Sequence, residues 1–289
     1  MMGRIMVAGA TSRLGDSILK ALLKRVPVDR LVAGARDPQR AANLAAQGLE
    51  VRGADYGDHA GMLAALRGVD RLFLVSAKAG GDRLALHDNA IRAAQAVGVR
   101  HVVYPALQRR EGVHADIDGV TESDIATEQL LRASGMAYTI IHYPPAAEWI
   151  PALVGDRVVR KGMRLPAGEG KIPLTGREDL AAACAAILAL GGHENSTIRL
   201  NAGTCYSMHM LAELYSELLA VPITYTAITP EQYVAERVAD GLPLHTAHLF
   251  SDWLTAAATG VFDQPDPALK NLIDAPVRPL SEVLTAALE

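Results

Sequence analysis

The strongest constraint on the fold is a regular alternation of short apolar runs and helical segments over about the first 142 residues. The apolar runs lie at 4–9, 31–35, 71–75, 101–104 and 138–142, with a shorter one around Val51. Between them, the pattern predicts helices at 14–25, 38–47, 58–66, 83–97 and 122–134. Strands that alternate with helices form a parallel sheet with helices on both faces. We therefore predict an α/β fold with a doubly wound parallel sheet.

The alternation loosens after about residue 150, where a Gly- and Pro-rich stretch runs from Gly155 to Pro173. Beyond it, the sequence predicts helices at 178–190, 208–219, 230–240 and 245–259, and strands at 198–200 and 224–227. We predict a larger sheet domain at 1–150, which also takes a strand and a helix from about 175–205. The region 151–289 then forms a smaller α/β lobe, interleaved with the sheet domain, that binds the substrate.

Composition excludes several classes of protein. The net charge of −4 gives no electrostatic basis for binding nucleic acid. No apolar run approaches the ~20 residues of a membrane span, and the start of the chain lacks the pattern of a signal peptide. Two cysteines, Cys184 and Cys205, are too few for a disulfide framework. We expect a cytoplasmic protein, monomeric or homodimeric, that binds neither membranes nor nucleic acid.

We expect no metal site. His245 and His248 share one face of a predicted helix, but no carboxylate or cysteine accompanies them at a zinc spacing. Glu122, Asp124 and Glu128 lie near the start of another helix, where acids favour the helix dipole. We interpret these acids as helix-capping residues in preference to catalytic ones.

A glycine turn between the first strand and the first helix indicates a site for a dinucleotide pyrophosphate. At a helix amino terminus the N–H groups are free and the dipole favours a phosphate. Gly9 permits the tight turn, and Gly15 lets helix and strand pack closely. Ser12 replaces the usual middle glycine, so its Cβ narrows the approach while its hydroxyl could donate to a phosphate. The predicted contacts are Gly9, Thr11, Ser12, Arg13, Leu14 and Gly15; the alternative is a purely structural turn.

Arg36, at the end of the second strand, indicates the form of the dinucleotide. NAD-binding folds place an acid there for the ribose hydroxyls, whereas this strand ends Gly34-Ala35-Arg36. Asp37 follows, but Pro38 makes it a better helix cap. A guanidinium suits a 2′-phosphate, so we predict NADP(H). The alternative is that Arg36, like Arg13 and Arg40, is only a solvated surface residue.

Two further turns complete the expected cofactor site. Asp55 and Tyr56 follow the third strand, where they suit an adenine wall. Ser76, Ala77 and Lys78 follow the fourth strand, and this turn is expected to run beneath the ribose and nicotinamide. Lys78 could contact the cofactor or could equally be an exposed lysine of the loop.

Several segments together resemble a known family. These are Asp37-Pro38-Gln39-Arg40-Ala41, Ala54-Asp55-Tyr56-Gly57-Asp58, Thr127-Glu128, Ser134-Gly135, Tyr138-Thr139, Gly260-Val261-Phe262-Asp263 and Leu272-Ile273. They resemble the NmrA-like atypical short-chain dehydrogenases/reductases, and most of all the branch of NADPH-dependent quinone oxidoreductases and triphenylmethane reductases. The resemblance covers almost the whole chain. It implies a Rossmann-type NADP-binding domain and reduction of a quinone or related carbonyl compound.

Like the family, the chain lacks the Tyr-x-x-x-Lys pair of ordinary short-chain dehydrogenases, since none of its eight tyrosines has a lysine four residues later. It departs from the family at the expected nicotinamide end. The family carries Thr-Ser where this chain has Pro105 and Ala106 after Tyr104, His or Lys in place of Asp124, and Arg-Asn where this chain has His142 and Tyr143. By its position the resemblance implies cofactor contacts at Tyr104, Pro105, Ala106 and Pro144.

Tyr143 is the first candidate for a proton donor or substrate hydrogen bond, and His142 is the second. Tyr143 could instead line the pocket or pack against the lobe. Trp149, Trp253, Phe250 and Tyr233 could line a substrate pocket between the two parts of the chain or belong to the core.

Three functions remain open on the sequence. The first is an NADPH-dependent oxidoreductase that reduces an apolar quinone or conjugated carbonyl compound. The second is an NADP-binding redox sensor without turnover, which the altered 104–106 and 142–145 segments motivate. The third is a non-redox enzyme of secondary metabolism that reuses the fold.

Overall fold

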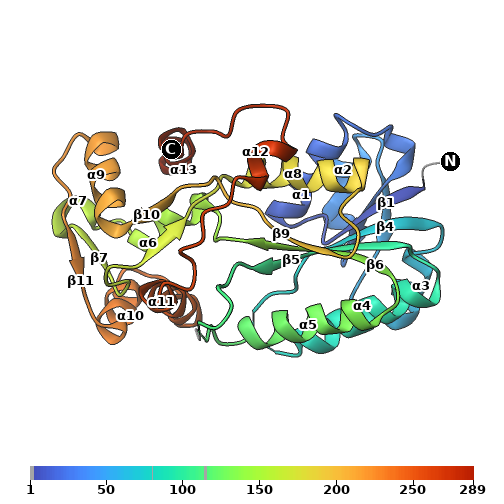
Figure 1. Ribbon diagram of the computed structural model, residues 1–289, viewed down its shortest axis with the longest axis horizontal. Coiled ribbons are helices and arrows are strands. Elements are labelled where there is room, and N and C mark those ends of the chain that lie inside the picture. Colours follow the sequence, from blue (N-terminus) through green and yellow to red (C-terminus); the bar gives the residue numbers. More distant parts are fainter. Residues whose placement is uncertain (1–2, 80, 114–115) are drawn as a thin grey trace.

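The computed structural model describes residues 3–79, 81–113 and 116–289 (Figure 1). Its centre is a seven-stranded sheet in the order β3-β2-β1-β4-β5-β6-β9, and all neighbouring strands are parallel. The strands are β1 (Arg4–Ala8), β2 (Leu31–Ala35), β3 (Glu50–Gly53), β4 (Val69–Leu74), β5 (His101–Leu107), β6 (Ala137–Tyr143) and β9 (Ser196–Arg199). The predicted doubly wound fold of Rossmann type is confirmed.

Alternation of side chains along the strands builds two apolar layers, because successive residues point to opposite faces. Val7 and Phe73 pack in one layer, and Met6 and Leu72 pack in the other. The first layer carries α1 (Arg13–Leu22), α2 (Ala42–Ala45), α8 (Arg177–Leu190) and α12 (Ala268–Leu272). The second carries α3 (His59–Ala65), α4 (Arg83–Ala96) and α5 (Thr121–Ala133).

The remaining elements form a lobe beside the carboxyl ends of the strands, on the left in Figure 1. It contains two small sheets, in which β10 (Cys205–Ser207) pairs with β8 (Lys171–Pro173) and β11 (Tyr225–Ala227) pairs with β7 (Met163–Leu165). Its helices are α6 (Ile150–Val154), α7 (Val158–Lys161), α9 (Met208–Leu219), α10 (Pro230–Ala239), α11 (Leu244–Ala258) and α13 (Leu280–Leu288). These elements share a core of their own that includes Tyr215, Tyr233 and Phe262.

Two elements late in the sequence return to the large sheet. Helix α8 packs against α1, and β9 extends the sheet beyond β6. A buried amide cluster then fixes the segment after α11: the Asn201 amide donates to Gln108, and the Gln108 amide donates to the carbonyls of Phe262 and Gln264. The lobe is thereby held against the edge of the sheet.

One predicted helix was wrong in its extent. Instead of a single helix at 38–47, the chain forms a 3₁₀ turn (Pro38–Ala41) and then the single-turn helix α2. The backbone of Ala41 leaves the helical region there, at φ −106° and ψ 17°. Only Ala41 and Leu44 are buried in this stretch, so a continuous helix would bury no further apolar side chain. Asp37 does cap the turn, as predicted, by accepting from the Gln39 N–H at 3.0 Å.

Among the helices of the described ranges, none has the length and apolarity to cross a membrane. In the same ranges, no group of three or more His, Cys, Asp or Glu side chains is placed to hold a metal ion.

Candidate active site

The turn between β1 and α1 leaves no room for side chains at two positions. Gly9 has φ +84°, and a Cβ on it would lie 2.8 Å from the Cβ of Val75. A Cβ on Gly15 would lie 2.3 Å from the carbonyl oxygen of Gly9. Both contacts are closer than real Cβ atoms come, so the tight turn and the close helix packing require glycine. This cradle suits the pyrophosphate of a dinucleotide.

Ser12 has a structural role that the sequence did not indicate. It is the N-cap of α1, and its Oγ accepts a hydrogen bond from the Gly15 N–H at 3.0 Å. The N–H groups of Arg13 and Leu14 lie in the first turn of the helix, where no carbonyl of the helix is available to accept their hydrogen bonds. These two groups therefore stay available for an anion, while Ser12 stabilises the helix that presents them.

Arginines lie next to the cradle at the end of β2. Arg36 and Arg40 are exposed, and so is Arg13 at the start of α1. Among the described residues, none of the three has a hydrogen-bond or ion-pair partner for its guanidinium. Asp37, the acid next to Arg36, accepts from the Gln39 N–H through its Oδ1 and forms no ion pair with these arginines among the described residues. This end of the site fits a ligand with an additional phosphate.

Asp55 and Tyr56 are held in place by local hydrogen bonds. Asp55 accepts from the Gly57 N–H at 3.0 Å, and the Tyr56 hydroxyl donates to the carbonyl of Val75 at 3.0 Å. Burial raises the pKa of Tyr56, so its phenol stays neutral. Tyr56 thus ties the end of β3 to the end of β4, and its role as an adenine wall stays a prediction.

The turn after β4 is fixed by side chains of α4 and by a backbone carbonyl of β5. The Ser76 hydroxyl donates to the Pro105 carbonyl at 2.6 Å, and the Ala77 N–H donates to His87 Nε2 at 2.9 Å. The Arg83 Nε donates to the Ala77 carbonyl at 3.0 Å. Both backbone groups of Ala77 are therefore hydrogen-bonded to side chains of α4.

The hydrogen bonds of His87 define its tautomer. Nε2 accepts from Ala77, so the ring proton is on Nδ1, which donates to the Thr127 Oγ1 at 2.9 Å. Thr127 in turn donates to the Ser123 carbonyl at 2.6 Å. Burial and the nearby charge of Arg83 lower the pKa of His87 to about 3, so the ring is neutral.

Asp124 lies at the centre of this buried network and does not cap α5, so that interpretation was wrong. It forms an ion pair with Arg83 at 2.7 Å, accepts from the Tyr104 hydroxyl at 2.7 Å, and accepts from the Leu107 N–H at 2.8 Å. Asp124 is 1% exposed and Arg83 is 5% exposed. The pair links the turn after β4 to the end of β5.

Tyr104 and Ala106 face the α4 and α5 side of the sheet, whereas Pro105, between them, lines a cavity. Tyr104 is fully buried, and burial together with the Asp124 carboxylate raises the pKa of its phenol. Of these three predicted contacts, the structure brings only Pro105 to the cavity surface.

This cavity has a volume of about 430 Å³ and lies between the carboxyl ends of the strands and the lobe. The structure brings these predicted site residues together around it: Ser12, Arg13, Leu14, Ser76, Ala77, Lys78, Pro105 and Tyr143. The other predicted cofactor residues do not line it: Gly9, Thr11, Gly15, Arg36, Asp55, Tyr56, Tyr104, Ala106 and Pro144. The opposite wall is largely apolar.

Aromatic residues from the lobe form that wall. Trp149 and Trp253 stack with ring centroids 5.3 Å apart and an interplanar angle of 20°. Both line the cavity, together with Leu249 and Leu107. Phe250 packs against Trp149 at 5.7 Å and belongs to the core of the lobe, as does Tyr233. Of the four candidate pocket aromatics, the two tryptophans thus reach the cavity.

Tyr143 ends β6 at the floor of the cavity and is half-buried. Within the described ranges its hydroxyl has no hydrogen-bond partner, and it is not sealed from solvent. Burial raises its pKa to about 12, so the phenol keeps its proton near neutral pH. Such a group can donate to a ligand oxygen in the cavity.

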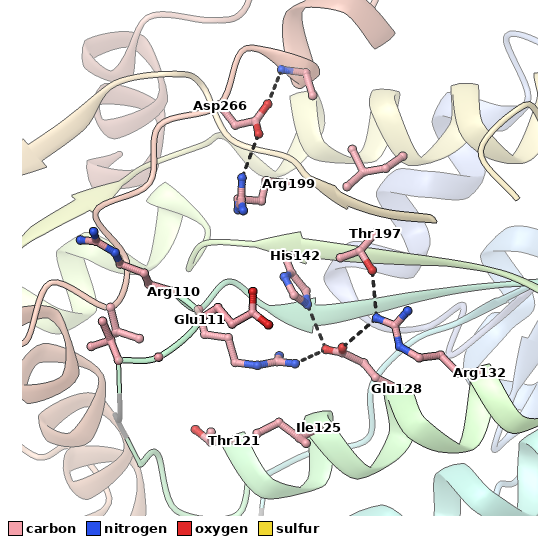
Figure 2. Close-up of a pocket in the computed structure, with 16 residues that line it drawn as sticks. Arg110, Glu111, Thr121, Ile125, Glu128, Arg132, His142, Thr197, Arg199 and Asp266 are labelled. Carbon is pink, nitrogen blue, oxygen red and sulfur yellow. Dashed lines mark hydrogen bonds and ion pairs between the residues drawn. The ribbon is translucent and has the colours of Figure 1, made fainter. Parts of the chain in front are cut away.

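His142 lies on the other side of the same strand. Because neighbouring strand residues face opposite sides, it lines a second pocket, which Figure 2 shows, and not the cavity beside Tyr143. Its Nε2 lies 2.9 Å from the Glu128 Oε1, which also accepts from Arg109 at 2.6 Å. Glu128, interpreted from sequence as a capping acid, is instead a buried ion-pair partner in the middle of α5.

Arg83, His87 and Thr127 were missed by sequence reasoning, as was Arg177, which lines the cavity from the start of α8. Arg83 and His87 stand four positions apart and therefore share one face of α4. That spacing is the only local signal. It did not reveal that this face is turned inward against α5.

A family model described as NAD(P)H-binding matches residues 9–190. Quinone oxidoreductase 2 of Escherichia coli (strain K12) is 34% identical over 280 residues, 96% of each chain. An NmrA-like family domain-containing oxidoreductase of Aspergillus flavus is 26% identical over 80% of this chain and 76% of its own.

Two solved structures superpose on 99% of this chain. The NADPH-dependent quinone oxidoreductase of Escherichia coli in complex with NADPH superposes with a TM-score of 0.91 and 32% identity, covering 99% of this chain and 100% of its own. The triphenylmethane reductase of Citrobacter sp. superposes with a TM-score of 0.90 and 27% identity, covering 99% of each.

The protein is an NAD(P)H-dependent oxidoreductase, as its family and its relatives show. The chain belongs to the NAD(P)H-binding family whose family model it matches. The predicted resemblance to the NmrA-like quinone and triphenylmethane reductases is confirmed.

Proposed function

We propose that this protein uses NADPH to reduce a quinone or a related conjugated carbonyl compound. The observation that carries the proposal is the cavity itself. Ser12, Arg13 and Leu14 of the cradle and the turn at Ser76–Lys78 form one side of it, and the stacked pair of Trp149 and Trp253 forms the other. A cofactor and a flat apolar substrate would thus share one enclosed space.

The residues of the cradle would hold the cofactor by its phosphates. The N–H groups of Arg13 and Leu14 would bind the pyrophosphate, and Arg36 would bind the 2′-phosphate, with Arg40 near by. The turn at Ala77 would support the nicotinamide end, which when bound supplies the hydride. Arg36 stands where NAD-binding folds place an acid for the ribose hydroxyls, and this supports a preference for the phosphorylated cofactor.

Tyr143 would direct the substrate oxygen. Its neutral phenol can donate a hydrogen bond to a carbonyl and supply a proton as the hydride arrives. The oxygens of a reduced quinone are weakly basic, so this donation matters more for an aldehyde or ketone. His142 faces the other pocket and has no part in this scheme.

The test is NADPH oxidation with simple apolar quinones, together with calorimetric binding of NADP⁺. Turnover with quinones supports the proposal. Tight binding without turnover would replace it with the redox-sensor reading, and absence of binding would favour a non-redox enzyme.

A further inference from the structure

A second pocket, outside the proposed reaction, lies at the edge of the large sheet, between α5 and the segment that leads into α12 (Figure 2). It has a volume of about 670 Å³. Its polar lining comes from five places: the loop after β5, α5, β6, β9 and residue 266. It shares no lining residue with the cavity that holds Tyr143.

Glu128 gathers cationic groups on one side of this pocket. Its carboxylate is 7% exposed, and it lies 2.6 Å from Arg109, 2.9 Å from His142 and 3.6 Å from Arg132. One buried carboxylate thus orients three nitrogen-bearing side chains, as the dashed lines in Figure 2 show. Because His142 Nε2 faces the carboxylate, its Nδ1 is left without a partner among the described residues.

Two arginines have unused donors at the mouth. Arg132 donates to Thr197 and to the Tyr138 hydroxyl, each at 3.1 Å, and Arg199 makes a single contact with Asp266 at 3.4 Å. Each side chain is 43% exposed, and each guanidinium has five N–H groups. In Figure 2 the two arginines lie on either side of His142.

The charges of the lining leave a positive excess. Four arginines and three acids line the pocket, so it carries one net positive charge even with His142 neutral. Arg110 and Glu111, both exposed on the loop after β5, have opposite charges that sum to zero. The excess therefore falls on the group around His142.

We propose that this pocket binds the oxyanion group, phosphate or carboxylate, of a small molecule. Arg132 and Arg199 would donate to its oxygens, while Glu128 keeps Arg109 and His142 in position beneath it. A planar guanidinium matches two oxygens of such a group.

Calorimetry can test this with inorganic phosphate and, separately, succinate as probes. Each is titrated at constant ionic strength into protein saturated with NADP⁺, so that the cofactor cradle is filled. We expect saturable binding of at least one probe, and the stronger one identifies the group as phosphate or carboxylate. Arg132→Gln and Arg199→Gln should each weaken it by about tenfold or more, the effect of a lost charge-assisted hydrogen bond.

Arg92→Gln is the matched control, because Arg92 pairs with Asp88 on exposed α4 outside this pocket. It removes the same charge and should leave binding unchanged. Absence of saturable binding would overturn the proposal, and so would equal weakening by all three variants. A parallel titration without NADP⁺ includes Arg36→Ala. If only this variant loses the probe, the anion belongs to the cofactor cradle and the proposal fails, while the proposed reductase function stands.

Discussion

Among single residues, Arg36 is expected to set the cofactor preference, because its guanidinium is exposed and unpaired among the described residues. Arg36→Ala should weaken NADPH binding by about 1–3 kcal/mol, since a charge-assisted hydrogen bond to the 2′-phosphate is lost. NADH binding should barely change. Calorimetry with both cofactors measures the difference, and equal affinity of the unaltered protein for the two would refute this assignment.

Ser12 and Gly9 lie in one turn but differ in what they do. Ser12→Ala removes the cap of α1 and should lower the free energy of unfolding by about 1 kcal/mol, whereas Ser12→Gly should cost only a few tenths. Both should still bind NADPH, and Ser12→Gly opens the approach to the pyrophosphate. Gly9→Val should abolish binding, because its side chain would meet Val75 at a positive φ. Urea unfolding and calorimetry separate stability from binding, and normal NADPH binding by Gly9→Val would place the pyrophosphate elsewhere.

Tyr143 is expected to distinguish two classes of substrate. Tyr143→Phe keeps the ring and removes the hydroxyl, so quinone turnover should stay largely intact. Aldehyde or ketone reduction should fall by at least about tenfold, the low end of what a lost hydrogen bond to a transition state costs. Steady-state kinetics with both classes decides this. Unchanged rates with both would remove Tyr143 from the mechanism.

At the scale of elements, α4 and α5 act through the buried network beneath the turn at Ala77. His87 has a pKa of about 3 in the folded protein against 6.5 for an unperturbed histidine, so between these values only the unfolded chain binds the proton. The stability from this site is therefore complete above about pH 6.5 and is lost as the pH falls toward 3.

We expect the free energy of unfolding to decrease more steeply from about pH 6.5 to 4.5 in the unaltered protein than in His87→Gln, by up to about 1.4 kcal/mol per pH unit. Urea titrations at several pH values measure both slopes. His59→Gln is the matched control, since His59 is exposed on α3. Parallel slopes for the unaltered protein and His87→Gln would mean that His87 does not stay neutral.

At the scale of the whole molecule, the lobe completes the cavity by placing Trp149 and Trp253 opposite the cofactor cradle. Trp253→Ala should raise the KM for an apolar quinone by about tenfold, because stacking area is lost. The affinity for NADPH should not change. Phe250→Leu, behind the wall, serves as the control for general loosening of the lobe. A parallel loss of NADPH affinity in Trp253→Ala would show that the tryptophans support the cofactor and not the substrate.

The sequence alone determined the sheet, the cradle and the cation beside it. Alternating apolar runs fix which segments are strands, and a right-handed crossover between parallel strands then leaves few arrangements. Gly9 and Gly15 were found because their signals are local: a tight turn and a close approach. The role of Arg36, inferred from a missing acid at a strand end, stays a prediction. The period of two along β6 puts His142 and Tyr143 on opposite faces of the sheet, and the structure places them in different pockets.

Only the tertiary structure decided which polar side chains meet. Asp124 looks like a helix-terminal acid in sequence, and it becomes a buried partner of Arg83 because α4 and α5 pack face to face. The distance of 104 residues between Trp149 and Trp253 hides their stacking in the same way. Pairings of this kind depend on how separate elements pack, and no local pattern encodes that packing.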